Sequence, residues 1–200
     1  MKKLFLLALV LGFSVVSFAQ EKFSEYDMSY FNKKYDIEVG TIKNGNCSFY
    51  IYCEPKDNTK KVGFILESKN VESFCNQLNS IKQKYSEWTK TAKDNNVTSY
   101  DKKFDVNFKS VSAFFLYGSK WCLSYAISFK PYFKVTSDGE CLVVFNVGEL
   151  TASSNRFMTV KGFMMAFNSL DEIDEFIKAF DLQKMQDNEM KEKEKDNLFK

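Results

Sequence analysis

The first half of the chain has a hydrophobic pattern that predicts three strands followed by a helix. Tyr35–Val39 alternates between apolar and polar residues, and Cys47–Cys53 and Lys61–Leu66 are runs of strand-forming residues. An Asn-Gly pair at 44–45 favours a two-residue hairpin turn between the first two strands. Apolar residues then recur at the spacing of one helical face: Val71, Phe74, Cys75, Leu78, Ile81, Tyr85 and Trp88.

The second half of the chain repeats this order of elements. Its pattern predicts strands at 132–135, 141–147 and 160–167, with an Asp-Gly turn at 138–139 between the first two. A helix over 170–180 follows the third strand. Each half is therefore expected to form a hairpin, a third strand and a helix.

Matching positions in the two halves indicate internal duplication. Gly45 and Cys47 recur 94 residues later as Gly139 and Cys141, and Gly63-Phe64 recurs 99 residues later as Gly162-Phe163. The apolar positions of the two helices also match at the second spacing. We therefore predict two internally duplicated β3α-type units, over about 34–91 and 129–182. Chance similarity is the alternative.

The segment between the two units has the pattern of an additional hairpin. Residues 104–128 alternate on both sides of a Gly-Ser pair at 118–119. Ser169 and Glu172 form a capping box at the start of the second helix. We expect a single α+β domain over 20–182 with a largely antiparallel sheet and two helices packed on one face. The charged tail at 183–200 is expected to be solvated or frayed.

Pairing the hairpins across two-residue turns suggests where a partner binds. In this register Val39 faces Tyr50 and Phe133 faces Val144, so both faces of the sheet carry apolar residues. Two helices can cover only one of these faces. The candidate partner-binding face consists of Val39, Tyr50, Tyr52, Phe133 and Val144. The alternative is that the central hairpin, residues 21–30 or the tail covers this face as ordinary core.

The amino terminus has the pattern of an export signal. A basic start is followed by an apolar run from Leu4 to Val16 and by small residues at the cleavage positions Ser17 and Ala19. The apolar run is shorter than the roughly 20 residues of a membrane-spanning helix. We expect residues 1–19 to be a removed signal peptide, and the mature chain to be soluble, periplasmic or secreted, without stable membrane insertion.

Composition excludes several kinds of chemistry. The chain has no histidine, which excludes nucleophile–histidine pairs and histidine metal sites. Its five cysteines form no C-x-x-C pair, and its eight glycines form no phosphate-binding loop. Removal of Lys2 and Lys3 leaves 26 basic residues (28 − 2) against 26 acidic ones, without a basic cluster. We therefore expect no cofactor, no metal and no nucleic acid.

Two weaker chemical signals remain. Ser99 and Lys102 have the serine-x-x-lysine spacing of some acyl-transfer enzymes, but they precede a strand and lack companion motifs. Cys47 and Cys141 occupy equivalent positions in the two units, so a disulfide could join them across a pseudo-twofold axis. Small buried thiols are the alternative for both cysteines.

These patterns favour a non-catalytic binding or interaction protein outside the cytoplasm. The expected partner is an unknown protein or a small apolar ligand, and a homo-oligomer is compatible with the apolar face. One alternative is a small hydrolase that uses carboxylates or the serine-lysine pair. Another is a structural component of an envelope assembly, for which self-association would be the sign.

Overall fold

The computed structural model describes residues 21–40, 46–181, 187, 190 and 194. These residues form an α+β fold built from antiparallel sheets and two helices. The elements in chain order are β1 Glu21–Met28, η1 Ser29–Phe31, β2 Lys33–Val39, β3 Ser48–Tyr52, β4 Glu54–Pro55, β5 Val62–Glu67, α1 Ser68–Asp94, β6 Tyr100–Lys103, β7 Val111–Tyr117, β8 Lys120–Ile127, β9 Tyr132–Val135, β10 Cys141–Val147, β11 Leu150–Ala152, β12 Asn155–Val160, β13 Phe163–Phe167 and α2 Leu170–Lys178.

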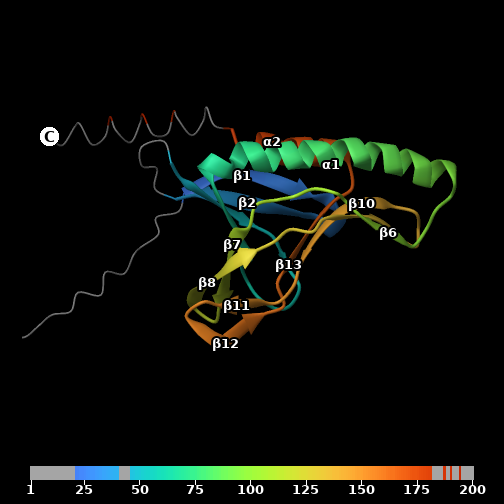
Figure 1. The fold of residues 1–200 in the computed structure, drawn as a ribbon. Coiled ribbons are helices and arrows are strands. Elements are labelled where there is room, and N and C mark those ends of the chain that lie inside the picture. Colours follow the sequence, from blue (N-terminus) through green and yellow to red (C-terminus); the bar gives the residue numbers. More distant parts are fainter. Residues whose placement is uncertain (1–20, 41–45, 182–186, 188–189, 191–193, 195–200) are drawn as a thin grey trace, which may run out of the picture.

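The strands form two main sheets and not the one sheet that we expected. One sheet has six strands in the order β1-β2-β3-β5-β7-β8, and the other has five in the order β4-β13-β10-β9-β6. The chain crosses between the sheets after Tyr52, because the next strand, Glu54–Pro55, pairs with β13. Strands β11 and β12 form a separate hairpin that lies at the end of the molecule away from the helices (Figure 1).

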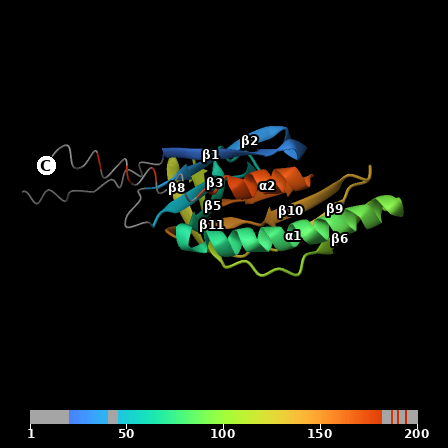
Figure 2. The same ribbon diagram turned by 90° about the horizontal axis from the view of Figure 1, so that it is seen from above.

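One hydrophobic core joins the two sheets and the two helices. Phe64 of β5 stacks on Phe163 of β13 with 6.2 Å between ring centroids. Helix α1 contacts β5 and β10, and α2 contacts β1 and β13. Both helices therefore bridge the sheets, and they lie side by side on the same side of the molecule (Figures 1 and 2).

Helix α2 begins at the predicted capping residue. The Ser169 hydroxyl accepts a hydrogen bond from the Glu172 backbone N–H at 3.2 Å. The Glu172 carboxylate accepts backbone N–H bonds from Asn168 and from Ser29, each at 2.8 Å. Glu172 is buried, so these bonds satisfy a charge that would otherwise destabilise the fold. The same carboxylate therefore connects η1 to the start of α2 through hydrogen bonds.

The two predicted units have the same strand order. Strands β2, β3 and β5 are consecutive neighbours followed by α1, and β9, β10 and β13 are consecutive neighbours followed by α2. In the first hairpin Val39 pairs with Phe49, and in the second Phe133 pairs with Val143. Each residue of the second pair lies 94 positions after its counterpart. Duplication as the origin of this likeness stays a prediction.

The hairpin register differs by one residue from our expectation. The second turn has three residues and not two, because Gly139 adopts a left-handed conformation with φ of 85°. Thr136 therefore pairs with Glu140 through a 2.9 Å backbone hydrogen bond, and Cys141 pairs with Val135. The first hairpin shows the same shift, since Val39 pairs with Phe49 and not with Tyr50. Residues 44–45 of its turn lie outside the described residues.

A one-residue shift exchanges the two faces of a strand. Ile37 and Val39 consequently share the buried face with Phe49 and Ile51, whereas Tyr50 points to the opposite side. Our expectation that both faces of this hairpin carry apolar residues therefore holds on the outer face only for β3, since Asp36 and Glu38 occupy that face of β2.

The segment between the units forms the expected hairpin, β7 and β8, which turns at Gly118 with φ of 61°. It adds to the six-stranded sheet beside β5. The predicted signal peptide at 1–19 and most of the tail at 183–200 lie outside the described residues. No helix in the described part of the chain is both long and apolar enough to cross a membrane.

Candidate functional site

The five residues of the predicted partner face do not form one exposed surface. Val39, Phe133 and Val144 are buried, and only Tyr50 and Tyr52 are partly exposed. Val39 pairs with Phe49 and therefore shares the core-facing side of the hairpin. The two tyrosines lie on the outer face of the six-stranded sheet, which is the face opposite the helices.

Val144 and Phe133 are buried by different parts of the molecule. Val144 forms a small apolar cluster with Leu142 and Ala166 on the outer face of the five-stranded sheet, and Phe31 of η1 packs against it. Phe133 faces α1, where its ring lies 6.0 Å from that of Tyr85. In the second unit, therefore, both faces of the hairpin are covered.

The two partly exposed tyrosines belong to a continuous group of apolar side chains across four strands. Tyr52 pairs with Gly63, Gly63 with Phe114, and Phe114 with Leu123. The Phe114 ring lies 5.1 Å from Tyr52, 5.7 Å from Tyr50 and 5.9 Å from Trp121, measured between centroids. We call this group the aromatic strip; it consists of Tyr50, Tyr52, Phe114, Trp121, Leu123 and Tyr125.

Gly63 makes this arrangement possible. A Cβ atom at this position would lie 2.8 Å from the Cζ atom of Phe114 and 1.9 Å from the carbonyl oxygen of Ile51. Any side chain here would therefore displace the Phe114 ring, which is buried beneath its aromatic neighbours. The glycine in the middle of β5 allows the ring to fill the centre of the strip.

The strip is apolar in its centre and charged along one side. Trp121 and Tyr125 are 49% and 61% exposed, and both helices pack on the other face of the sheet. The Lys61 ammonium lies 5.3 Å from the Tyr52 ring centroid and 6.0 Å from that of Trp121. The Tyr52 hydroxyl donates a 2.9 Å hydrogen bond to Glu38. Burial, together with Glu38, raises the pKa of Tyr52, so this donor stays protonated.

Strands β1 and β2 supply the charged side. Lys22 pairs with Asp36 at 2.7 Å, and Lys34 pairs with Asp27 at 3.2 Å and with Glu25 at 3.5 Å. These ion pairs are exposed, so they contribute little stability. They instead border the apolar strip with a polar rim, as the rim of a protein interface does.

The predicted disulfide is not formed. Cys47 and Cys141 are both present as buried thiols, and they lie beside strands of different sheets. Cys47 precedes β3 of the six-stranded sheet, and Cys141 begins β10 of the five-stranded sheet. Burial raises the pKa of the Cys47 thiol to about 11. A thiol with so high a pKa is almost entirely protonated at neutral pH and is a poor nucleophile.

The serine-lysine pair does not lie at the start of a helix. Ser99 has a left-handed backbone, with φ of 52°, and precedes β6, whereas Lys102 lies within that strand. The serine-x-x-lysine motif brings its two side chains to one face by opening a helix, and this segment opens a strand. Lys102 instead places its ammonium 4.4 Å from the ring centroid of Trp88. Among the described residues, no group of three or more His, Cys, Asp or Glu side chains could hold a metal ion.

Trp121 and Tyr125 are the functional candidates that sequence reasoning missed. Their alternation with Leu123 placed all three on one face of the predicted hairpin, but that hairpin was treated as a possible cover and not as part of the face. Comparisons with protein-family models, with curated proteins and with solved structures gave no match. The site is therefore defined by its own geometry: an aromatic sheet face in an antiparallel α+β protein.

Proposed function

We propose that the protein is a non-catalytic interaction module that docks a polypeptide partner on the aromatic strip. The observation that carries this proposal is the row of contacting rings formed by Tyr50, Tyr52, Phe114 and Trp121 on the outer face of the six-stranded sheet, which no helix among the described residues covers. Exposed apolar patches of this kind are uncommon on monomers and concentrate at interaction sites. Aromatic side chains also dominate the binding energy of protein interfaces.

A polypeptide suits this surface better than a small molecule does. The strip extends over four strands, β3, β5, β7 and β8, whereas small ligands prefer compact concave sites with apolar walls. The hollow at the side of the strip, beside Tyr52 and Lys61, is lined mostly by charged side chains. A second copy of the chain is the partner that we propose first, because a twofold dimer brings the same surface of two chains together, and two copies of the strip would then remove each other's apolar side chains from water. The proposal involves no cofactor and no nucleic acid.

We also propose that the protein is exported to the periplasm or the cell exterior. The support is the pattern of residues 1–19 together with cleavage positions that would leave Gln20 as the first residue. The protein isolated from the exported fraction should begin at Gln20. An amino terminus at Met1 in that fraction would contradict this proposal.

The alternatives differ from this function in what they require. A hydrolase needs a nucleophile or paired carboxylates in a concave site, and its serine-lysine version is less supported because Ser99 and Lys102 lie before and within a strand. A structural component of an envelope assembly requires association that continues beyond a closed dimer. The size of the assembly at rising concentration therefore separates this second alternative from a docking module.

The experiment compares Trp121→Ser with a matched control, Tyr30→Ser. Tyr30 is 43% exposed, and it lies in η1, outside the strip. Removal of an exposed aromatic anchor is expected to weaken association about 30-fold, which corresponds to about 2 kcal/mol. The control should associate as the wild type does. Both variants should keep the wild-type melting temperature within about 2 °C.

Light scattering during gel filtration measures the association over a range of protein concentrations. A wild-type chain that remains monomeric throughout this range would remove the second copy as the partner. A photoreactive side chain at position 121 would then identify any heterologous partner in the native host. If that side chain gives no specific adduct either, the docking function of the strip is wrong.

A further inference from the structure

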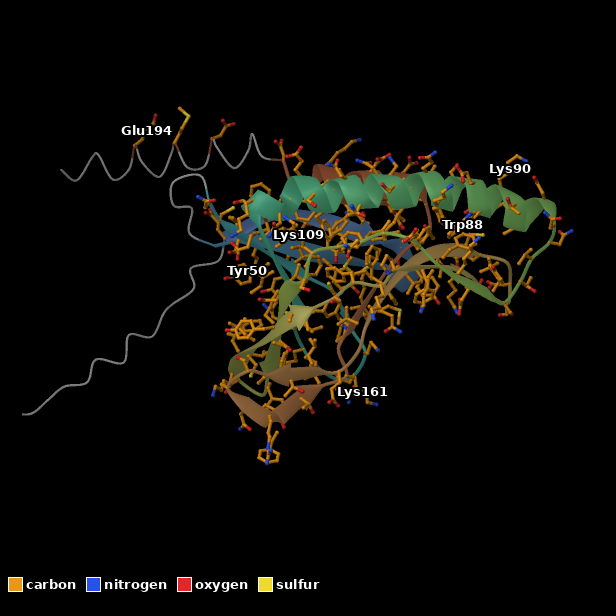
Figure 3. The ribbon with its side chains drawn as sticks, in the orientation of Figure 1. Tyr50, Trp88, Lys90, Lys109, Lys161 and Glu194 are labelled. Atoms are coloured by element: carbon orange, nitrogen blue, oxygen red, sulfur yellow. The ribbon has the colours of Figure 1, made fainter. Side chains whose placement is uncertain are left out.

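A second site lies toward the other end of the molecule, between the end of α1 and the sheet edge at β6 (Figure 3). We propose that this site is a pocket for a small aromatic or apolar carboxylate. The cavity has a volume of about 310 Å³, and it is lined by Trp88, Thr91, Ala92, Val97, Tyr100, Lys102 and Phe133. Figure 3 shows Trp88 beneath the C-terminal half of α1, toward the opposite end of the molecule from Tyr50.

The path of the chain after α1 creates the cavity. The helix ends at Asp94, and the Val97 backbone N–H then returns to the Ala92 carbonyl oxygen at 2.9 Å. Asn96 and Ser99 both have positive φ, at 50° and 52°, which reverses the chain. Strand β6 therefore comes back beside β9 and leaves a hollow below the last turns of the helix.

Aromatic contacts fix the wall of the pocket. The Trp88 indole stacks on Phe104 with 5.0 Å between centroids and an interplanar angle of 13°. It also meets the Phe133 ring edge-on at 5.8 Å. Because two neighbouring rings hold the indole, this wall of the cavity is fixed before a ligand binds and does not have to be ordered by it.

The residues that line the cavity indicate the chemical class of the ligand. Apart from Lys102, the lining side chains carry no charge at neutral pH, and most of the lined surface is apolar. The Lys102 ammonium lies over the Trp88 ring, and no carboxylate pairs with it among the described residues. One unpaired cation beside an apolar hollow matches a ligand with an apolar body and one anionic group. The volume is at the lower end for ligand pockets, which favours a bicyclic ring or a similar size.

The test uses three naphthalene probes that differ only in charge: naphthylacetate, naphthylethanol and naphthylethylamine. The chain has two tryptophans, so the two indole N–H signals in a ¹H–¹⁵N spectrum report separately on the pocket and on the aromatic strip. Trp121→Phe assigns the signals. We expect naphthylacetate to shift the Trp88 signal with a dissociation constant below about 1 mM. The Trp121 signal should not move.

Two variants test the roles of charge and space. Lys102→Met should weaken naphthylacetate binding about tenfold while leaving naphthylethanol binding unchanged, since it removes the charge and keeps the apolar stem. Thr91→Phe adds a ring at an exposed lining position and should block all binding. Lys90→Phe is its matched control, because Lys90 is also exposed on α1 but does not line the cavity.

Each outcome decides the proposal. A Trp88 shift that follows the order carboxylate, alcohol, amine and that disappears in Thr91→Phe supports it. No shift with any probe, or equal shifts of both indoles, overturns the pocket. A preference for the carboxylate that persists in Lys102→Met, or the absence of such a preference in the wild type, overturns the ligand class. None of these results depends on whether the aromatic strip binds a partner.

Discussion

The two β3α units place the same strand order in different surroundings. Position 50 in the first unit corresponds to position 144 in the second, 94 residues later, and both lie on the outer faces of their hairpins. Tyr50 is partly exposed there, whereas Val144 is 2% exposed beneath Phe31 and its neighbours. Equivalent strand positions are therefore partly exposed in one unit and ordinary core in the other.

The difference arises from what covers each sheet and not from the strands alone. In the second unit, η1 folds over the outer face of β10 and β13, and Glu172 holds η1 in place through the Ser29 backbone N–H. In the first unit the neighbouring hairpin, β7–β8, extends the sheet beside β5 and does not fold across it. Its aromatic residues enlarge the open face, which explains why the strip forms on this sheet.

The largest expected change in the free energy of unfolding tests the contrast between the covered and the partly exposed outer face. Val144→Asp places an unpaired carboxylate in an apolar cluster and should lower the free energy of unfolding by about 4 kcal/mol or more. Tyr50→Asp, at the equivalent position, should cost less than about 1.5 kcal/mol because water reaches this side chain. Urea denaturation of both variants measures the difference. Equal losses would show that the outer face of the first unit is covered as well.

Local pattern was enough to predict most of the elements. The alternation in 35–39 and 132–135 and the helical spacing from Val71 to Trp88 predicted strands and a helix that the structure contains. These signals depend only on neighbouring residues, so they can be read from sequence. The single sheet was wrong, because the crossing at Glu54–Pro55 is determined by distant pairing with β13.

The candidate site was harder to predict for two physical reasons. The left-handed Gly139 lengthens the second turn by one residue, and this small change exchanges the faces of the whole hairpin. The strip and the pocket also join residues far apart in the chain, such as Tyr52 with Trp121 and Trp88 with Phe133. Sequence pattern identified Tyr50 and Tyr52, but it gave no signal for the contacts that surround them.

A smaller expected loss of stability tests whether the two units unfold together. The Tyr85 hydroxyl, on α1 of the first unit, lies 2.9 Å from the Cys141 carbonyl oxygen and 2.6 Å from that of Asn168, both in the second unit. Burial raises the pKa of Tyr85 to about 12, so the hydroxyl remains a donor at neutral pH.

Tyr85→Phe should therefore lower the free energy of unfolding by about 1 kcal/mol, since it leaves a buried carbonyl without this donor. The unfolding transition should remain single, because one core serves both units. Calorimetry measures both quantities. Two separate transitions in the variant would mean that the units fold independently, and the comparison between them would then be one between domains.

The smallest expected change in the free energy of unfolding depends on pH. It concerns a second hydrogen-bonded contact between the units. Asp57, in the loop before β5, accepts backbone N–H bonds from Thr59 at 2.9 Å and from Lys161 of the second unit at 2.8 Å. Partial burial raises the pKa of the Asp57 carboxyl, but these hydrogen bonds outweigh it, and the pKa is lowered overall.

A lowered pKa means that the ionised carboxylate stabilises the folded state. This contribution is fully present above the unfolded pKa of about 3.9 and is lost as the pH falls through the lower folded value. Asp57→Asn should therefore be less stable than the wild type by about 0.5 kcal/mol at pH 7, because the site is largely exposed. Near pH 3 the difference should shrink, since the wild-type carboxyl then becomes protonated. A difference that stays constant from pH 7 to pH 3 would show that the charge of Asp57 does not hold the two units together.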